Sequence, residues 1–203
     1  MKLYYKPGAC SLASHIALRE IGADFSLERV DTERQTTESG ADFGAINPNG
    51  YVPALRLDDD QVLTEGAAIL QFIADRKPEA GLAPAAGTLQ RARLQEQLNF
   101  IASELHSAFG PLFAKTASDE EKEASKARVR RKLDRVEAIL ADGRDYILGN
   151  GYSVADAYLF VVAGWAVPTG IGLGDWPHLA AHAERVASRS PVRDALSAEG
   201  LLN

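Results

Sequence analysis

Signals for β-strands stop a little before the middle of this chain, and that change constrains the fold more than any other feature. Up to Leu63, short apolar runs alternate with turn-forming residues, whereas from Thr88 onward apolar residues recur only at helical spacing. The sequence therefore predicts an α/β domain over residues 1–80 and an all-α domain over residues 88–203. Residues 81–87, rich in Ala, Pro and Gly, are the predicted linker.

The first eighty residues predict the element order β-α-β-α-β-β-α. A strand, helix, strand sequence implies a parallel pair with a right-handed crossover, and the later hairpin adds an antiparallel edge. Ser11 is the predicted N-cap of the first helix and Thr64 that of the last one. The strands are expected at residues 2–5, 25–30, 54–57 and 62–63, and the helices at 12–21, 40–46 and 65–76.

The second domain is predicted to contain one centrally buried helix. Residues 157–166 are apolar on all sides, which is typical of a helix surrounded by protein. Ser153 and Asp156, just before this run, form a variant of the capping box. An apolar stripe at spacings of three and four predicts a long helix earlier in the domain; it consists of Leu94, Leu98, Ile101, Leu105 and Phe109.

Composition excludes several functions. The net charge of −6 over 203 residues, without a run of Lys or Arg, argues against a nucleic-acid partner. The longest apolar run, Ala157–Val167, is too short to span a bilayer, and the N-terminus has no apolar signal core. A single cysteine precludes an internal disulfide and suits a reducing compartment. We expect a cytoplasmic protein that binds neither membranes nor nucleic acids.

That cysteine, Cys10, lies between the first strand and the first helix. A helix N-terminus favours an anion, so this position predicts a lowered thiol pKa; the alternative is a small buried hydrophobe. Ala13 stands where a Cys-x-x-Cys motif would have its second thiol. Cys10 would therefore need an external thiol partner, which points towards glutathione chemistry.

Two further positions are candidates for ligand binding, and each also has a simpler structural explanation. Val52-Pro53 precedes a strand, either as an ordinary trans edge proline or as a cis bond that offers the Val52 backbone to an extended peptide. Glu65 opens a helix, where it either stabilises the helix dipole or binds an ammonium group. In the second case the neighbouring backbone N–H groups would bind a carboxylate. Glu65 and these N–H groups together would then suit the ammonium and carboxylate groups of an α-amino acid.

Asn99, Ser103 and His106 follow one another at spacings of four and three and predict a polar stripe on one helix face. On its own such a stripe is better read as the boundary between core and solvent. His15, His178 and His182 have no neighbours in sequence that favour metal ligation, and no metal site is expected.

Taken together, these residues resemble the glutathione transferases, most closely the bacterial beta class of cysteine-type enzymes. The resemblance covers the whole chain, and its specificity lies in the order and spacing of four segments. They are Tyr4-Tyr5 with Pro7-Gly8-Ala9-Cys10-Ser11-Leu12-Ala13, Asn47-Pro48 with Val52-Pro53-Ala54-Leu55, Leu63-Thr64-Glu65-Gly66-Ala67-Ala68-Ile69, and Tyr152-Ser153-Val154-Ala155-Asp156.

The resemblance implies a thioredoxin-like N-terminal domain, an all-helical C-terminal domain and a homodimer. It also implies a cis Val52-Pro53 bond and glutathione as co-substrate, without a further cofactor. Residues matching Ser103 and Glu104 reach the glutathione of the partner subunit in this family. The implied catalytic residues are Cys10, Ser11 and His106. The implied glutathione-binding residues are Tyr5, Cys10, Tyr51, Val52, Pro53, Glu65, Gly66, Asn99, Ser103, Glu104 and His106.

The chain departs from the family pattern at three positions. Gly66 replaces a usual Ser, Ser107 a frequent Lys, and Gln35 a common basic residue. The last two changes remove positive charge near a negative ligand, which predicts modest affinity for glutathione.

The sequence thus predicts an enzyme, a glutathione transferase that joins the glutathione thiolate to small hydrophobic electrophiles. Phe109, Leu112, Phe113 and Trp165 are the candidates for the electrophile pocket. Two alternatives remain open at this point. One is a glutathione-dependent thiol reductase or peroxidase that uses Cys10 through a mixed disulfide. The other is a non-catalytic ligand-binding protein of the same fold.

Overall fold

The computed structural model describes residues 1–149 and 151–202. Contacts between α-carbons divide the chain into two units, Met1–Ala83 together with the chain from Ser188 onward, and Pro84–Ala187. The expected all-α domain over residues 88–203 differs from this division, because the last helix packs against the first unit. No helix in the described part of the chain is both long and apolar enough to cross a membrane.

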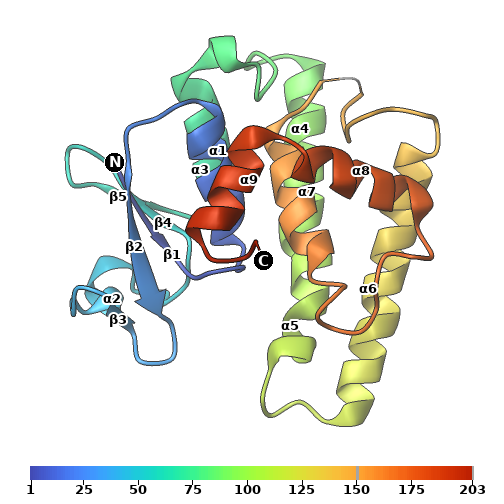
Figure 1. The fold of residues 1–203 in the computed structure, drawn as a ribbon, viewed down its shortest axis with the longest axis horizontal. Coiled ribbons are helices and arrows are strands. Elements are labelled where there is room, and N and C mark those ends of the chain that lie inside the picture. The colour runs from blue at the N-terminus through green and yellow to red at the C-terminus, as the bar shows by residue number, and fades with distance from the viewer. Residues whose placement is uncertain (150, 203) are drawn as a thin grey trace. The chain divides into compact units, whose positions relative to one another are not determined.

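The first unit contains a mixed sheet in the order β3-β2-β1-β4-β5 (Figure 1). β1 pairs in parallel with β2 and antiparallel with β4, and β4 forms a hairpin with β5, as predicted. The short β3 was not predicted, because two threonines give no alternating pattern. The strands are β1 Lys2–Tyr5, β2 Ser26–Asp31, β3 Thr36–Thr37, β4 Ala54–Arg56 and β5 Val62–Thr64.

Four helices and a 3₁₀ turn complete this unit. α1 is buried from Ser11 to Leu18 because β1, α3 and α9 all pack against it. Figure 1 shows α9, the red helix near the C-terminus, beside α1. The elements are α1 Ser11–Glu20, α2 Phe43–Ile46, α3 Gly66–Arg76, the 3₁₀ turn Pro78–Ala80 and α9 Ser190–Ala198.

Both predicted N-caps in this unit are displaced by one residue. Cys10, not Ser11, occupies the N-cap of α1, and Glu65, not Thr64, that of α3; neither side chain caps its helix. Ser11 instead closes the preceding turn, where its Oγ accepts from the Lys6 N–H at 3.2 Å and donates to the Lys6 carbonyl at 3.3 Å. The two residues expected to carry chemistry therefore lie at helix starts without acting as caps.

The second unit is helical, and its centre is α7, as the apolar run predicted. Nine of the eleven α7 residues are buried. Contacts with α4, the π-helical segment and α8 surround the helix, and Figure 1 shows it in orange. The elements are α4 Leu89–Phe100, the π-helical segment Ile101–His106, α5 Ser107–Phe113, α6 Asp119–Leu140, α7 Val154–Gly164 and α8 Pro177–Ala187.

The capping box at the start of α7 is present, as predicted, and it is larger than the sequence indicated. The Asp156 carboxylate accepts the Ile147 N–H at 2.7 Å, the Ser153 N–H at 2.9 Å and the Ser153 hydroxyl at 2.8 Å. The His182 Nε2 lies 2.9 Å from the same carboxylate. Since all these groups are buried, Asp156 satisfies several donors that water does not reach.

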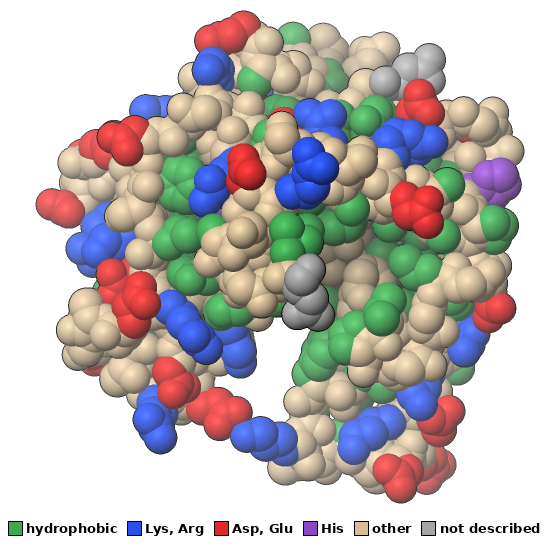
Figure 2. Space-filling view, in the orientation of Figure 1, with side chains coloured by type: hydrophobic (Ala, Val, Ile, Leu, Met, Phe, Trp, Pro, Cys, Tyr) green, Lys and Arg blue, Asp and Glu red, His purple; other side chains and the backbone are tan. Residues whose placement is uncertain are grey.

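Acidic and basic side chains are interspersed over the face shown in Figure 2, without a broad field of one sign. This face therefore offers no basic surface of the kind that nucleic acids require.

Candidate functional site

Cys10 is held by the loop before β4. Its Sγ donates to the Val52 carbonyl at 3.2 Å. Burial raises the pKa of the Cys10 thiol to about 11 and outweighs the backbone N–H groups of Cys10 and Ser11, which act in the opposite direction. The predicted lowering of this pKa is therefore wrong. Burial destabilises the thiolate more than the N–H groups at the helix N-terminus stabilise it. Cys10 is a neutral hydrogen-bond donor at pH 7.

The loop that carries Val52 and Pro53 has the expected cis peptide bond. Buried Asn47 holds this loop, because its Nδ2 donates to the Tyr51 carbonyl at 2.7 Å and its Oδ1 accepts from the Asn49 N–H at 3.1 Å. The Tyr51 side chain is 70% exposed. The Val52 carbonyl is already engaged by Cys10, whereas the Val52 N–H has no hydrogen-bond partner among the described residues. One backbone donor thus remains available here.

Glu65 has an unusual backbone conformation. Its φ is +67°, in the left-handed region that non-glycine residues seldom adopt and that costs about 1–3 kcal/mol. The side chain is exposed. Beside it, within the described part of the chain, the N–H groups of Gly66 and Ala67 have no acceptor, as expected for the first turn of a helix. A carboxylate and free N–H donors therefore lie together at the start of α3.

The C-terminal helix fixes the loop that leads to Cys10. Glu199, at the end of α9, accepts the Gly8 N–H at 3.0 Å through Oε2 and lies 2.9 Å from the His15 Nδ1 through Oε1. The Arg19 Nε donates to the His15 Nε2 at 2.9 Å, so the ring proton is on Nδ1 and is donated to Glu199. Sequence reasoning missed this network, because 184 positions separate its two main members.

Tyr5 lies beside the same network, with its ring centroid 6.3 Å from that of His15. Burial raises the pKa of the Tyr5 phenol, and the charge of Glu199 raises it further. The hydroxyl is therefore protonated at neutral pH and is able to donate.

In the second unit, the residues of the predicted polar stripe differ in their exposure to solvent. Asn99, Ser103 and Glu104 are exposed, and the Ser103 hydroxyl donates to the Asn99 carbonyl at 2.8 Å. Glu104 forms an ion pair with Lys132 of α6, which holds the pKa of the Glu104 carboxyl below its usual value. His106 is instead half-buried and faces α7. The three residues Asn99, Ser103 and His106 thus do not act as one face.

His106 contacts two aromatic residues. Its Nδ1 lies 3.2 Å from the Tyr158 hydroxyl, and its ring makes an edge contact with Trp165, with centroids 4.8 Å apart. Burial lowers the pKa of His106, so the imidazole is neutral at pH 7. A neutral imidazole has one donor and one acceptor nitrogen, and either suits a reacting thiol.

The residues predicted to form the electrophile pocket come together on the same side of the second unit. Trp165 contacts Phe109 and Phe113 edge-on, with centroid distances of 5.7 and 5.4 Å. Phe109 and Phe113 stack at 6.3 Å. Phe113 is 54% exposed, so this aromatic cluster presents apolar surface to solvent.

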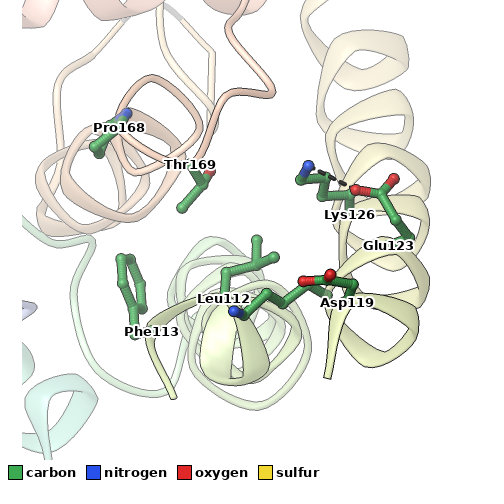
Figure 3. A pocket seen from close by; sticks show the side chains of 8 residues that line it. Leu112, Phe113, Asp119, Glu123, Lys126, Pro168 and Thr169 are labelled. Carbon is green, nitrogen blue, oxygen red and sulfur yellow. Dashed lines mark hydrogen bonds and ion pairs between the residues drawn. The ribbon is translucent and has the colours of Figure 1, made fainter. Parts of the chain in front are cut away.

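Leu112 and Phe113 also line an open pocket of about 370 Å³, shown in Figure 3. Asp119, Glu123 and Lys126 of α6 form its opposite wall, where Lys126 and Glu123 pair at 2.7 Å. Charges of both signs line this pocket, so it favours no particular ion.

Two domain models of one protein family match most of this chain. The glutathione S-transferase N-terminal and C-terminal domain models match residues 8–76 and 100–190. The glutathione S-transferase GstA of Escherichia coli O157:H7 is 48% identical over 99% of this chain and 100% of its own length. The chain belongs to the glutathione S-transferase family.

Solved structures agree with this assignment. A beta-class glutathione S-transferase of Sphingomonas chungbukensis has 50% identity and a TM-score of 0.97, and it covers 100% of both chains. A sphingomonad glutathione S-transferase complexed with glutathione has 52% identity and a TM-score of 0.96, again over the full length of both. The predicted fold and the predicted transferase class are therefore confirmed.

Two of the three departures from the glutathione S-transferase pattern, Gln35 and Ser107, have local structural roles. The Gln35 side chain donates to the carbonyls of Thr32 and Gly50 at 2.7 and 3.2 Å, and so it connects two parts of the loop. It adds no positive charge at this position. The Ser107 hydroxyl donates to the Ala102 carbonyl at 3.3 Å. At Gly66 the backbone N–H remains available although the hydroxyl is absent.

Proposed function

We propose that this transferase conjugates the thiol of glutathione to small hydrophobic electrophiles. The observation that carries the proposal is the start of α3, where the exposed Glu65 carboxylate lies beside the free N–H groups of Gly66 and Ala67. An α-amino acid end, such as that of the γ-glutamyl residue, has an ammonium for the first and a carboxylate for the second. The free Val52 N–H then suits the cysteinyl residue of the same tripeptide, held as an added strand.

The remaining candidates receive roles that follow from their surroundings. Tyr5 is the neutral donor proposed for the glutathione sulfur, and donors stabilise a thiolate. Cys10 and Ser11 are neighbours of that sulfur, because their own hydrogens are donated to the Val52 and Lys6 carbonyls. In the second unit, the aromatic cluster of Phe109, Phe113 and Trp165 takes the apolar electrophile. Neutral His106 stabilises negative charge as the new bond forms. Glutathione is the co-substrate, and the proposal requires no cofactor or metal.

The protonated state of Cys10 supports conjugation over the reductase alternative. A mixed disulfide requires the Cys10 thiolate as nucleophile, and a pKa of about 11 leaves about one thiol in ten thousand ionised at pH 7. In the transferase reaction glutathione itself supplies the nucleophile, so Cys10 does not have to ionise. Cys10→Ala should therefore keep conjugation within about tenfold, or 1.4 kcal/mol.

We also infer a cytoplasmic homodimer in which Ser103 and Glu104 of one copy approach the glutathione of the other. Their joint exposure supports this arrangement, and so does the family pattern. Light scattering should give twice the chain mass of 21.8 kDa. A monomer with full activity would contradict the proposed contribution of the second copy.

The deciding experiment is Glu65→Ala, with chlorodinitrobenzene as the electrophile. The KM for glutathione should rise at least tenfold while the KM for the electrophile changes less than twofold, because only the tripeptide loses its anchor. Asp175→Asn, which removes a carboxylate far from α3 in the sequence, is the control. Equal changes in both Michaelis constants would mean that Glu65 has a structural role, and the proposed binding mode would fail.

A further inference from the structure

The hydrogen bond between His106 and Tyr158 joins the end of the π-helical segment to the most buried helix of the second unit. The Nδ1 of His106 and the Tyr158 hydroxyl are 3.2 Å apart, and Tyr158 is 4% exposed. The Trp165 ring, 4.8 Å from the imidazole, supports it from a second direction. A half-buried histidine is thus fixed by residues of α7 and its C-cap, and α7 in turn is anchored by Asp156.

The direction of this hydrogen bond decides what His106 offers to a ligand. If the phenol O–H donates to Nδ1, the ring proton must lie on Nε2, and Nε2–H is a donor. If Nδ1–H donates to the phenol, Nε2 is an acceptor. A phenol is the stronger acid and an imidazole nitrogen the stronger base, so the first arrangement is favoured. Burial lowers the pKa of His106 and keeps the ring neutral, which makes this tautomer choice relevant at pH 7.

We propose that Tyr158 is a positioning residue that sets the orientation and tautomer of His106, so that Nε2–H is presented as a hydrogen-bond donor to the negative charge of the conjugation reaction. The inference rests on the proposed function, because it gives His106 a role in that reaction. The choice of tautomer, however, is a property of the free protein and is measured without any substrate.

The first test is the ¹⁵N spectrum of the histidine side chains in the free protein, with the His106 signals identified by their loss in His106→Asn. The wild-type ring should carry its proton on Nε2 and leave Nδ1 unprotonated. In Tyr158→Phe the two nitrogens should move towards each other, because both tautomers become populated. Tyr146→Phe is the matched control: Tyr146 contacts His182 at 6.3 Å between ring centroids, so a hydroxyl is removed beside a different histidine.

A wild-type proton on Nδ1 would overturn the proposal, and so would unchanged His106 signals in Tyr158→Phe. The wild-type spectrum decides the tautomer even if the variant does not fold.

The second test is a double-mutant cycle on the turnover of chlorodinitrobenzene. Tyr158→Phe should lower kcat about tenfold in the wild-type background, with the KM for glutathione within twofold. In the His106→Ala background the same change should lower kcat less than twofold, because Tyr158 acts through His106. Equal losses in both backgrounds would show that Tyr158 stabilises the fold only. If His106→Ala keeps full activity while the tautomer is as stated, the proposed function of His106 fails and the positioning stands.

Discussion

Each unit of this protein contains a buried histidine–carboxylate pair, and the two pairs differ in what else they hold. His15 and Glu199 in the first unit, and His182 and Asp156 in the second, approach to 2.9 Å in both cases. The remaining acceptor positions of Asp156 bind backbone and hydroxyl groups at the start of its own helix. The second oxygen of Glu199 binds the Gly8 N–H, two residues before Cys10.

The histidines differ as well. The second ring nitrogen of His15 accepts from Arg19, whereas the Nδ1 of His182 is buried with no hydrogen-bond partner among the described residues. The same chemical pair thus serves two purposes. In the second unit it fixes the start of the central helix, and in the first it connects the end of the chain to the candidate glutathione site.

Replacing the more heavily bonded carboxylate should have the largest effect on stability. Asp156→Ala leaves His182, the Ser153 hydroxyl and the Ile147 N–H without their buried acceptor. We expect a loss of about 3–5 kcal/mol in the free energy of unfolding, measured by urea denaturation. Asp156→Asn should lose less, because one acceptor oxygen remains. A loss below about 1 kcal/mol for Asp156→Ala would contradict the role assigned to this network.

The two histidines give a matched pair of substitutions. His15→Phe removes the hydrogen-bond partner of Glu199 Oε1 and of Arg19 Nε. The free energy of unfolding should fall by about 2–3 kcal/mol. His182→Phe removes one of several contacts to Asp156 and also removes an unsatisfied nitrogen, so it should cost about 1 kcal/mol. Urea midpoints with equal slopes would measure both. The comparison breaks down if the order is reversed or the two losses are equal.

The link from Glu199 to Cys10 should be visible in thiol reactivity. With a pKa of about 11, alkylation of wild-type Cys10 by iodoacetamide should accelerate about tenfold per pH unit from pH 7 to 10, because only the thiolate reacts. At fixed pH, Glu199→Gln should speed alkylation about threefold by releasing the Gly8 loop, an effect below 1 kcal/mol. Asp156→Asn serves as the control and should not change the rate. Similar acceleration in both variants would refute a specific connection.

The smallest effect is expected for an exposed ion pair. Arg130 and Asp175 approach to 2.9 Å, yet their side chains are 44% and 72% exposed. Asp175→Asn should change the free energy of unfolding by less than about 0.5 kcal/mol, and high salt should remove even that difference. A larger loss would mean that geometry alone, without burial, determines the strength of these pairs.

The sequence predicted the features that depend on neighbouring residues. The first two strands, the hairpin, the capping box and the buried α7 follow from alternation, helical spacing and turn-forming residues close together in the chain. The cis bond at Pro53 and the grouping of Phe109, Phe113 and Trp165 were also found, through the family resemblance and the apolar pattern.

The features that were missed depend on distant parts of the chain or on solvent. Assignment of α9 to the first unit requires the surface of α1, which the helix pattern of residues 190–198 does not reveal. The pKa of Cys10 followed from burial rather than from its place before a helix. The left-handed conformation of Glu65 has no sequence signal either, since a glycine would ordinarily mark it.

The wide turn at Ile101–His106 also sets the rotational phase of everything that follows it along the helix. A π-helical turn accommodates one residue more than an α-helical turn, and a regular α-helix turns by about 100° per residue. Winding all of these residues as a regular α-helix would therefore rotate α5 by about that angle, whereas deleting one residue would restore regular geometry and leave α5 in nearly its present phase. His106 and Phe109 both contact Trp165 only in the present phase. At full length, a regular helix would turn the aromatic surface of α5 away from α7. The irregular turn therefore accommodates one additional residue, and engineering that makes this helix regular has to remove a residue as well.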